Sequence, residues 1–490
     1  MKTLRAPCRQ LWHVICSTRE QRYTQHRLRL FRFPQQSQAM NHDPFGNWTP
    51  ARSLRWTLIT FVVVSLFARS FVDRLKPSKF EIMDFYQEWS SARSLMTGRS
   101  IYAPLSETIG PYLGMVKEPG TEWYWSINVH PPTSVLLGVP FQAIDYWNAF
   151  LAWNLTSLVA LALSLWMILR ELKIEFCGWC CMPLLVGLLL FEPLWQQTIQ
   201  GQLNLILLLM LTGVWVADRR DLPVLAGTLA GLALTVKLFP GFLFAYFLFQ
   251  RRWRALIAGT VSVVAFTLLT VQLAGTQAYV SYWNDVLPTT GQWWSTWNNA
   301  SLAGFWFKLF SVEQYGRQLT PLVGNMALAR IGTVVSWGIV LLLLLPVVWR
   351  ARSLEERDHA FGLSLTAMLL ISPVTWEHYF LLLFLPVTLV WMTLPETGAR
   401  RWMLGLVVVS LGMPLMMIGN IVIPGGFFAG TAGPAHTLLL LSLQMYGLLG
   451  LYVLHVKAAR PAFFAATQRA ELRAELRAEQ SPAPSAPSAT

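Results

Sequence analysis

Long apolar runs separated by short polar segments dominate the chain. A bilayer core of about 30 Å requires roughly 20 apolar residues in an α-helix. Runs that meet or approach this requirement occupy residues 54–72, 150–169, 178–197, 203–217, 255–274, 330–349, 360–372, 379–394, 402–423 and 437–455. The pattern therefore predicts an all-α polytopic membrane protein.

One further apolar stretch, residues 222–249, is too long for a single relaxed crossing and is interrupted between Lys237 and Pro240. Basic segments flank it on both sides, so its two ends are expected on the same side of the membrane. We predict two short helices that turn on the far side, with Lys237 at the turn. This brings the expected number of crossings to about twelve, with both termini inside.

Residues 131–146 are also apolar, but the segment is short and contains Pro140. If it crossed the bilayer, the basic segments at 170–173 and 218–221 would lie outside. That arrangement opposes the tendency of Lys and Arg to stay in the cytoplasm. We therefore expect a re-entrant or interfacial helix here.

The transmembrane domain is expected to span residues 53–456, with large outer loops at 73–130 and 275–329. Both loops are rich in aromatic residues, which are stable at the membrane interface. Residues 1–52 form a basic arm without an apolar run, and residues 457–490 end in Pro/Ser/Ala repeats. Neither terminal segment can bury a core, so both are expected in the cytoplasm and largely disordered.

Composition supports the membrane assignment, because 54% hydrophobic residues and 13% charged residues leave too little polar surface for a water-soluble globule. The net charge of +13 is compatible with nucleic-acid binding, but the basic residues sit in short loops between apolar runs. We interpret them as topology signals and expect no nucleic-acid partner. The five cysteines form no disulfide or zinc pattern and are expected to be structural thiols.

Polar residues gather at the ends of several apolar runs. They form four groups: Asp84 with Glu88, Gln202 with Asn204, Lys237 alone, and Trp376-Glu377-His378. With the topology above, all four groups fall on the outer face. Ionisable side chains next to hydrocarbon are costly, so a one-sided set of acid, amide, ammonium and imidazole groups indicates a reaction centre facing out of the cell.

Several short strings together carry a family resemblance. In chain order they are Asp84-Phe-Tyr, Gly98-Arg-Ser-Ile-Tyr102, His130-Pro-Pro132, Gly201-Gln-Leu-Asn204, Ala226-Gly-Thr-Leu-Ala-Gly-Leu-Ala-Leu-Thr-Val-Lys237-Leu-Phe-Pro240, Asn299-Ala-Ser-Leu-Ala-Gly304 and Ser372-Pro-Val-Thr-Trp-Glu-His378. In this order the set resembles glycosyltransferase family 87, over roughly residues 54–454. The resemblance implies a GT-C-like bundle with outer interfacial helices and loops.

The family holds bacterial polyprenyl-phosphate-mannose-dependent α-mannosyltransferases. The resemblance thus implies an enzyme of the bacterial inner membrane that takes a sugar, expected to be mannose, from a lipid-phosphate donor at the outer face. Its acceptor would be a lipid or glycan hydroxyl. In such enzymes an acid early in the first outer loop removes the acceptor proton, and Asp84 matches that place. Glu88 lies one helical turn further on and is a second candidate for the same cavity. The alternative for both acids is a solvated loop charge.

Lys237 is the only charged residue between Asp221 and Arg251. A fixed cation at this turn is suited to bind the donor phosphate and stabilise the charge that grows on it; a snorkelling lysine is the alternative. His378 is a second candidate for the phosphate or acceptor, against a structural histidine. Glu377 is expected to orient His378 or to be an interface charge.

Amide side chains at outer helix ends offer the hydrogen bonds that sugar hydroxyls need. Candidates for sugar or acceptor binding are Gln202, Asn204, Asn298 and Asn299, although amides at these positions also cap helices. His130 is a further candidate, but the two prolines that follow it can equally start the short helix at 131–146.

Other chemistry finds no support in the motifs. The sequence has no nucleotide-binding glycine loop and no Asp-x-Asp pair for a metal, so we expect no cofactor and no metal. In families such as the one this sequence resembles, lipid-phosphate mannose donors are β-linked and the products are α-linked, so the resemblance implies a single displacement with inversion. The competing interpretations are a lipid or sugar transporter or flippase, which should show repeated halves that are not visible here, and a non-catalytic subunit of envelope assembly.

Overall fold

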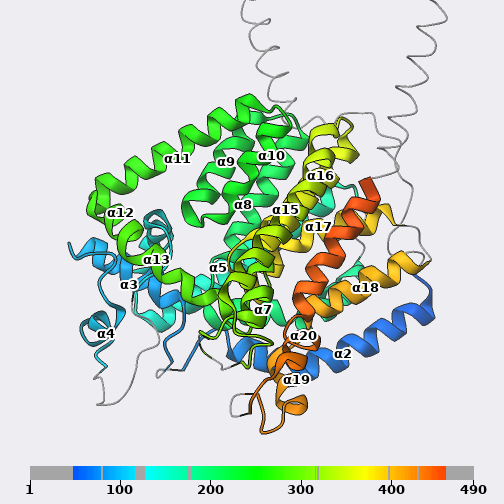
Figure 1. Ribbon diagram of the computed structural model, residues 1–490, viewed down its shortest axis with the longest axis horizontal. Helices are drawn as coiled ribbons and strands as arrows, with labels where there is room; N and C mark the ends of the chain where they lie inside the picture. Colours follow the sequence, from blue (N-terminus) through cyan, green and yellow to red (C-terminus); the bar gives the residue numbers. More distant parts are fainter. Residues whose placement is uncertain are drawn as a thin grey trace, which may run out of the picture. The chain divides into compact units, whose positions relative to one another are not determined.

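The computed structural model describes residues 48–78, 81–115, 127–174, 178–314, 316, 319–394, 398–427 and 430–459. These residues form helices, together with one isolated bridge between Leu319 and Ala432, and Figure 1 shows their arrangement. The all-α prediction is confirmed for this part of the chain. Most of the predicted terminal arm and tail lies outside the described residues.

Within the part of the chain that the structure describes, five helical segments are long and apolar enough to cross a membrane. They are α2 (Pro50–Asp73), α5 (Tyr146–Glu171), α11 (Trp253–Ala274), α15 (Met326–Arg350) and the span Pro434–Ala459, which opens with α20 (Pro434–Leu439). Each coincides with a predicted apolar run. The polytopic prediction is therefore confirmed.

Two predicted crossings are bent in the structure. Residues 178–197 divide into α6 (Cys181–Leu189) and α7 (Glu192–Gln200), and the two arms meet at 67°. Residues 402–423 divide into α18 (Ala399–Gly412) and α19 (Leu415–Val422), at 82°. Pro193 lies in the first turn of α7 and Pro414 directly before α19; a proline lacks the backbone donor and clashes with the preceding turn, so neither helix pair continues straight. Each pair is a broken span or a re-entrant loop, and the total of twelve crossings stays a prediction.

The predicted break at Lys237 is confirmed. Helix α9 (Pro223–Val236) ends directly before Lys237, whose backbone is extended, with φ −141° and ψ 144°. The short turn η4 (Phe239–Gly241) then leads into α10 (Phe242–Phe249). The extended residue points the lysine side chain away from both helices and toward the end of α8 (Asn204–Arg219).

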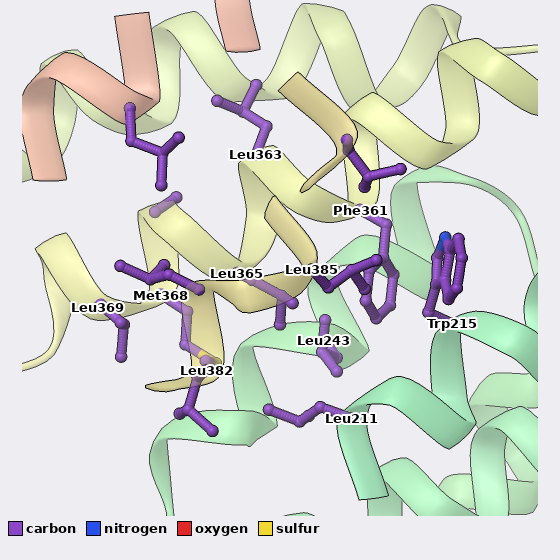
Figure 2. Packing of buried hydrophobic residues seen from close by; sticks show 14 of the residues in the cluster. Leu211, Trp215, Leu243, Phe361, Leu363, Leu365, Met368, Leu369, Leu382 and Leu385 are labelled. Carbon is purple, nitrogen blue, oxygen red and sulfur yellow. The ribbon is translucent and has the colours of Figure 1, made fainter. Parts of the chain in front are cut away.

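The main core lies where α8 and α10 meet α16 (Leu354–Ile371) and α17 (Phe384–Thr393). Figure 2 shows Trp215 of α8 beside Phe361 of α16, with Leu385 on the other side of the Phe361 ring and Leu243 between this ring and Leu211 of α8. Close packing of such large side chains fixes the relative positions of these helices. The start of α8 and the α9–α10 turn are thereby held together.

The loop at residues 73–130, which is predicted to be outer, contains α3 (Phe85–Met96) and α4 (Leu105–Leu113). Two short 3₁₀ turns follow it, η1 (Pro132–Leu137) and η2 (Val139–Phe141). The second predicted outer loop, residues 275–329, contains α12 (Gln277–Ser281), η5 (Tyr282–Val286), α13 (Leu287–Thr289), η6 (Thr290–Ser295) and α14 (Leu302–Phe310). Helices thus make up much of the part of both loops that the structure describes.

The segment at residues 131–146 begins and ends beside the first outer loop. His130 hydrogen-bonds to Glu88 at one end, and the Tyr146 hydroxyl accepts from the Met83 backbone N–H at 2.9 Å at the other. The helical part, Pro132–Phe141, covers only about 20 Å at the rise of a 3₁₀ helix, less than a bilayer core. These contacts agree with the prediction that this segment does not cross.

The basic segments predicted to be cytoplasmic gather at the other end of the bundle. Arg219 lies 3.3 Å from Glu171 and also pairs with Asp358, while Arg252 lies 2.7 Å from Asp221. These ion pairs join the ends of α5, α8, α11 and α16. Helices α8 and α9 therefore carry the ion pairs at one end and Asn204 and Lys237 at the other.

Candidate active site

A tight turn between α7 and α8 positions the first polar side chains. Gly201 ends α7 in the left-handed conformation, with φ +65°. A Cβ at this position would lie 2.7 Å from the Cβ of Phe85, so only glycine fits both the conformation and the space. The turn thus packs directly against the start of α3 and brings Gln202 next to Asp84.

Asp84 occupies the N-cap position of α3, yet its side chain makes no capping hydrogen bond. Instead, its Oδ2 accepts a hydrogen bond of 2.5 Å from Nε2 of Gln202. Burial raises the pKa of Asp84 to about 6, and the hydrogen bond from Gln202 partly opposes that rise. A carboxylate with a pKa near the working pH is well matched to accept a proton from a hydroxyl group.

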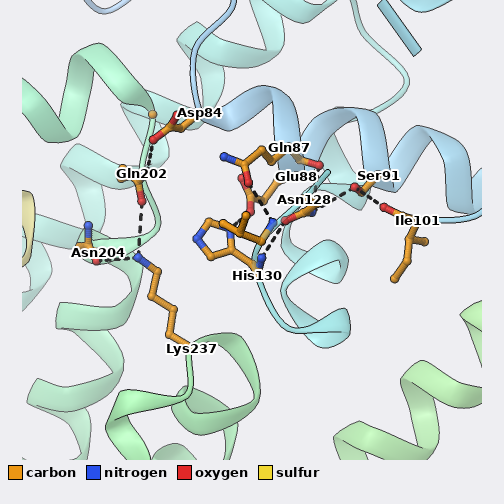
Figure 3. Close-up of polar contacts among 12 residues, drawn as sticks. Asp84, Gln87, Glu88, Ser91, Ile101, Asn128, His130, Gln202, Asn204 and Lys237 are labelled. Atoms are coloured by element: carbon orange, nitrogen blue, oxygen red, sulfur yellow. Dashed lines mark hydrogen bonds and ion pairs between the residues drawn. The ribbon is translucent and has the colours of Figure 1, made fainter. Parts of the chain in front are cut away.

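Lys237 approaches the same amide from the opposite side, as Figure 3 shows. Its Nζ donates to Oδ1 of Asn204 at 3.1 Å and to Oε1 of Gln202 at 3.4 Å, and it lies 4.5 Å from the ring centre of Tyr379. The side chain is only 3% exposed. Amide oxygens and a ring face stabilise the ammonium group without cancelling its charge.

Glu88 and His130 form a buried pair beside Asp84, joined by a hydrogen bond between Oε1 and Nδ1. The backbone around His130 is fixed as well, because its N–H donates to Asn128 at 2.9 Å and its carbonyl accepts from Tyr102 at 2.7 Å. The structure thus brings together two sequence candidates that lie 42 residues apart. Asn128, which positions His130, is not among the sequence candidates.

His378 is buried in η7 (Glu377–Leu383), and its Nε2 has no hydrogen-bond partner among the described residues. The adjacent Tyr379 ring is the one that Lys237 faces, so His378 lies next to a residue that contacts Lys237. Glu377 points elsewhere, because its carboxyl group hydrogen-bonds to Gln444. The expected orienting contact between Glu377 and His378 is therefore replaced by one to another helix.

Asn299 lies in a different polar network, between the second outer loop and the segment before η7. Its Nδ2 donates to the carbonyl of Pro373 at 2.9 Å, and its Oδ1 accepts from the backbone N–H groups of Ser301 and Thr375, both at 3.0 Å. Backbone groups thus occupy both polar atoms of this buried amide, which favours the structural role over sugar binding. Its neighbour Asn298 is half-buried.

Gln197 is a site residue that the sequence reasoning missed. It is fully buried in α7, where its Nε2 donates to the Gln202 carbonyl and its Oε1 accepts from Asn204 at 3.1 Å. It therefore braces the turn that carries both amides. The polar run Gln196-Gln197-Thr198 within an apolar segment was the available signal.

Around Asp84, the structure thus collects Glu88, His130, Gln202, Asn204, Lys237 and His378. Among the described residues, no three His, Cys, Asp or Glu side chains are grouped so as to hold a metal ion. The fold and this cluster define a helical membrane protein with a buried polar centre at one end of the bundle.

The family model of glycosyltransferase family 87 matches residues 128–373, half of the chain. The chain belongs to this family and is therefore a membrane glycosyltransferase. The helical fold agrees with the GT-C architecture expected from the sequence. The matched region includes His130, Gln202, Asn204 and Lys237. His378 lies shortly after its C-terminal end, and Asp84 lies well before its N-terminal end.

Two solved structures are similar to this chain, with low sequence identity. The crystal structure of ArnT from Cupriavidus metallidurans bound to undecaprenyl phosphate is 15% identical, with 85% of this chain and 79% of that chain covered and a TM-score of 0.38. The apo form of the same protein is also 15% identical, with 84% and 78% covered and a TM-score of 0.31. No curated protein matches the sequence significantly.

Proposed function

We propose that this glycosyltransferase moves mannose from a polyprenyl-phosphate donor to an acceptor hydroxyl at the outer face of the bacterial inner membrane, with inversion at the anomeric carbon. One observation carries the proposal: a single amide, that of Gln202, contacts both the Asp84 carboxylate and the Lys237 ammonium. A base for the acceptor and a cation for the donor phosphate thus lie on either side of one side chain.

Asp84 is the proposed general base. Its carboxylate is free of the capping role that its position in α3 offers, and its pKa of about 6 suits proton transfer near neutral pH. As the acceptor oxygen forms its bond to the sugar, its proton passes to Asp84. The bond between the anomeric carbon and the phosphate oxygen breaks at the same time, and its electron pair leaves with the phosphate.

Lys237 is proposed to stabilise the departing phosphate. Among the described residues, its hydrogen-bond partners are neutral amides and it faces an aromatic ring, while the carboxyl groups of Glu88 and Asp84 act on it without an ion pair. Its charge is therefore available to an anion. His378 is proposed as a second phosphate ligand, since its Nε2 is buried and unpartnered. The preference for mannose and for a polyprenyl carrier rests on the family resemblance.

The test is transfer of radiolabelled mannose from polyprenyl-phosphate-mannose into the lipid and glycan fractions of membranes that contain the protein. Asp84→Asn should lower the rate by about 100-fold or more, because the amide cannot accept the proton. Glu81→Gln is the matched control, since Glu81 is an exposed carboxylate in the same loop and should retain the wild-type rate.

Two results would contradict parts of this proposal. If Asp84→Asn kept more than about a tenth of the rate, Asp84 would not be the base, and Glu88 would become the candidate. If the wild-type protein used another polyprenyl-phosphate sugar but not the mannose donor, the choice of mannose would be wrong.

A further inference from the structure

We propose that Gln202 is a positioning residue: its amide fixes the positions of the Asp84 carboxylate and the Lys237 ammonium and keeps the two groups apart. This inference rests on the function proposed above. It assigns Gln202 a role different from the sugar contact expected from the sequence, because both polar atoms of its side chain are engaged within the protein.

The chemistry of the two neighbours fixes the orientation of this amide. An ammonium group can only donate hydrogen bonds, and an ionised carboxylate can only accept them. The Gln202 oxygen must therefore face Lys237 and its nitrogen must face Asp84, as the structure has them at 3.4 Å and 2.5 Å. The opposite orientation would bring oxygen against oxygen and nitrogen against nitrogen.

The backbone of Gln202 is held from two directions. Gln197 donates to its carbonyl oxygen, and the preceding Gly201 is wedged against Phe85, directly after Asp84. The side chain itself is only 7% exposed. A buried amide with a fixed backbone and two charged partners has little freedom to rotate, so it sets the positions of the groups on either side.

Separation of the two charges has a chemical purpose. In a direct ion pair, the cation would lower the pKa of the carboxyl group and weaken it as a base, and the carboxylate would cancel the charge intended for the phosphate. An intervening amide satisfies each group with a hydrogen bond but neutralises neither. Both groups then remain competent for their separate steps.

Asp84 also faces other titratable groups, namely Glu88, His130, Lys237, Tyr146 and Tyr379. These stay in place when Gln202 alone is changed. Gln202→Leu keeps most of the side-chain volume, so the charged groups remain apart while the hydrogen bond to Asp84 is lost. Since that bond lowers the pKa of Asp84, its loss should raise the pH at which the base becomes protonated.

The experiment compares the pH dependence of kcat/KM for the wild-type enzyme and Gln202→Leu, with the mannose donor described above. In the pH profile, kcat/KM falls on the acidic side where the base becomes protonated; in the variant this acidic limb should lie about one pH unit higher. The donor KM should also rise. Asn204→Leu is the matched comparison, because it removes the other amide from Lys237 without touching Asp84. It should raise the donor KM and leave the acidic limb in place.

Gln202→Glu serves as a second variant if leucine prevents folding, as judged by thermal unfolding in detergent. Glutamate has nearly the same size but puts a second carboxyl group beside Asp84, so it should also move the acidic limb upward. If Asp84→Asn were inactive but the acidic limb of kcat/KM were unchanged in both Gln202 variants, the positioning role of Gln202 would be wrong and the proposed base would stand. An active Asp84→Asn enzyme would overturn the proposed base, and the inference with it.

Discussion

The indole nitrogen of Trp153 donates a hydrogen bond of 2.8 Å to the carbonyl oxygen of Gly201. Trp153 belongs to α5, a membrane-spanning helix, and it is almost fully buried. The bond fixes the turn from which Gln202 and Asn204 project toward Asp84 and Lys237. A transmembrane helix that contributes no proposed catalytic group thus controls the geometry of the site.

Gly201→Ala should destabilise the protein and lower transfer activity, because it combines left-handed strain with a contact of 2.7 Å to Phe85. The strain alone costs roughly 1–2 kcal/mol for a residue with a Cβ. Gly114→Ala is the matched control: Gly114 also ends a helix with φ +68°, but open space surrounds its missing Cβ. Thermal unfolding in detergent should show a larger loss of Tm for Gly201→Ala. Equal losses would mean that Phe85 moves aside without cost.

The wild-type enzyme should lose activity in mild acid. Burial raises the pKa of Asp84 to about 6, so the base is ionised above that pH and protonated below it. We expect kcat/KM to fall about tenfold per pH unit below pH 6. Unfolding measured over the same pH range separates this loss from denaturation. A rate that stays flat down to about pH 4 would argue that Asp84 is not the titrating base.

Lys237→Met should weaken donor binding and slow the departure of the phosphate, while acceptor binding stays nearly intact. Loss of a preorganised group that stabilises transition-state charge typically lowers kcat by about 10²–10³. Arginine should rescue only in part, since its planar fork differs from a compact ammonium. Donor affinity and single-turnover transfer are the measurements.

Lys76→Met is the control for this substitution, because Lys76 also lies in the first outer loop, where its Nζ donates to Asn148 at 2.7 Å outside the site. It should behave like the wild type. If Lys237→Met also had the donor affinity and transfer rate of the wild type, Lys237 would be only a snorkelling lysine at the membrane interface. His378 would then be the candidate for phosphate recognition.

Labelling with a membrane-impermeant thiol reagent should verify the orientation of the bundle. In a variant without native cysteines, single cysteines at the exposed positions Glu81, Glu313 and Pro373 should react from outside. Cysteines at Asp221 and Arg352, which are exposed near the ion-paired end, should react only after the membrane is opened. If a cysteine at position 221 reacted from outside, the orientation of the bundle would be opposite to the proposed one.

Part of the candidate site could be predicted from the sequence. Asp84, Gln202, Asn204 and Lys237 stand out because polar residues beside long apolar runs are rare and costly, and the structure joins them. Asn299 stands out for the same reason, yet its amide serves the backbone instead. A polar residue at a helix end signals a buried hydrogen bond, but the sequence around it does not distinguish a backbone partner from a ligand.

The sequence alone determined the helical class, most of the crossing segments, the break at Lys237 and the segregation of basic loops. These features depend on local composition, because the bilayer selects for apolar length and the turn at Lys237 follows from nearby residues. Tertiary structure decided the hydrogen-bond partners. Asp84 and Gln202 are 118 residues apart, and the contact between them depends on how α3, α5 and α7 pack, which no local pattern encodes.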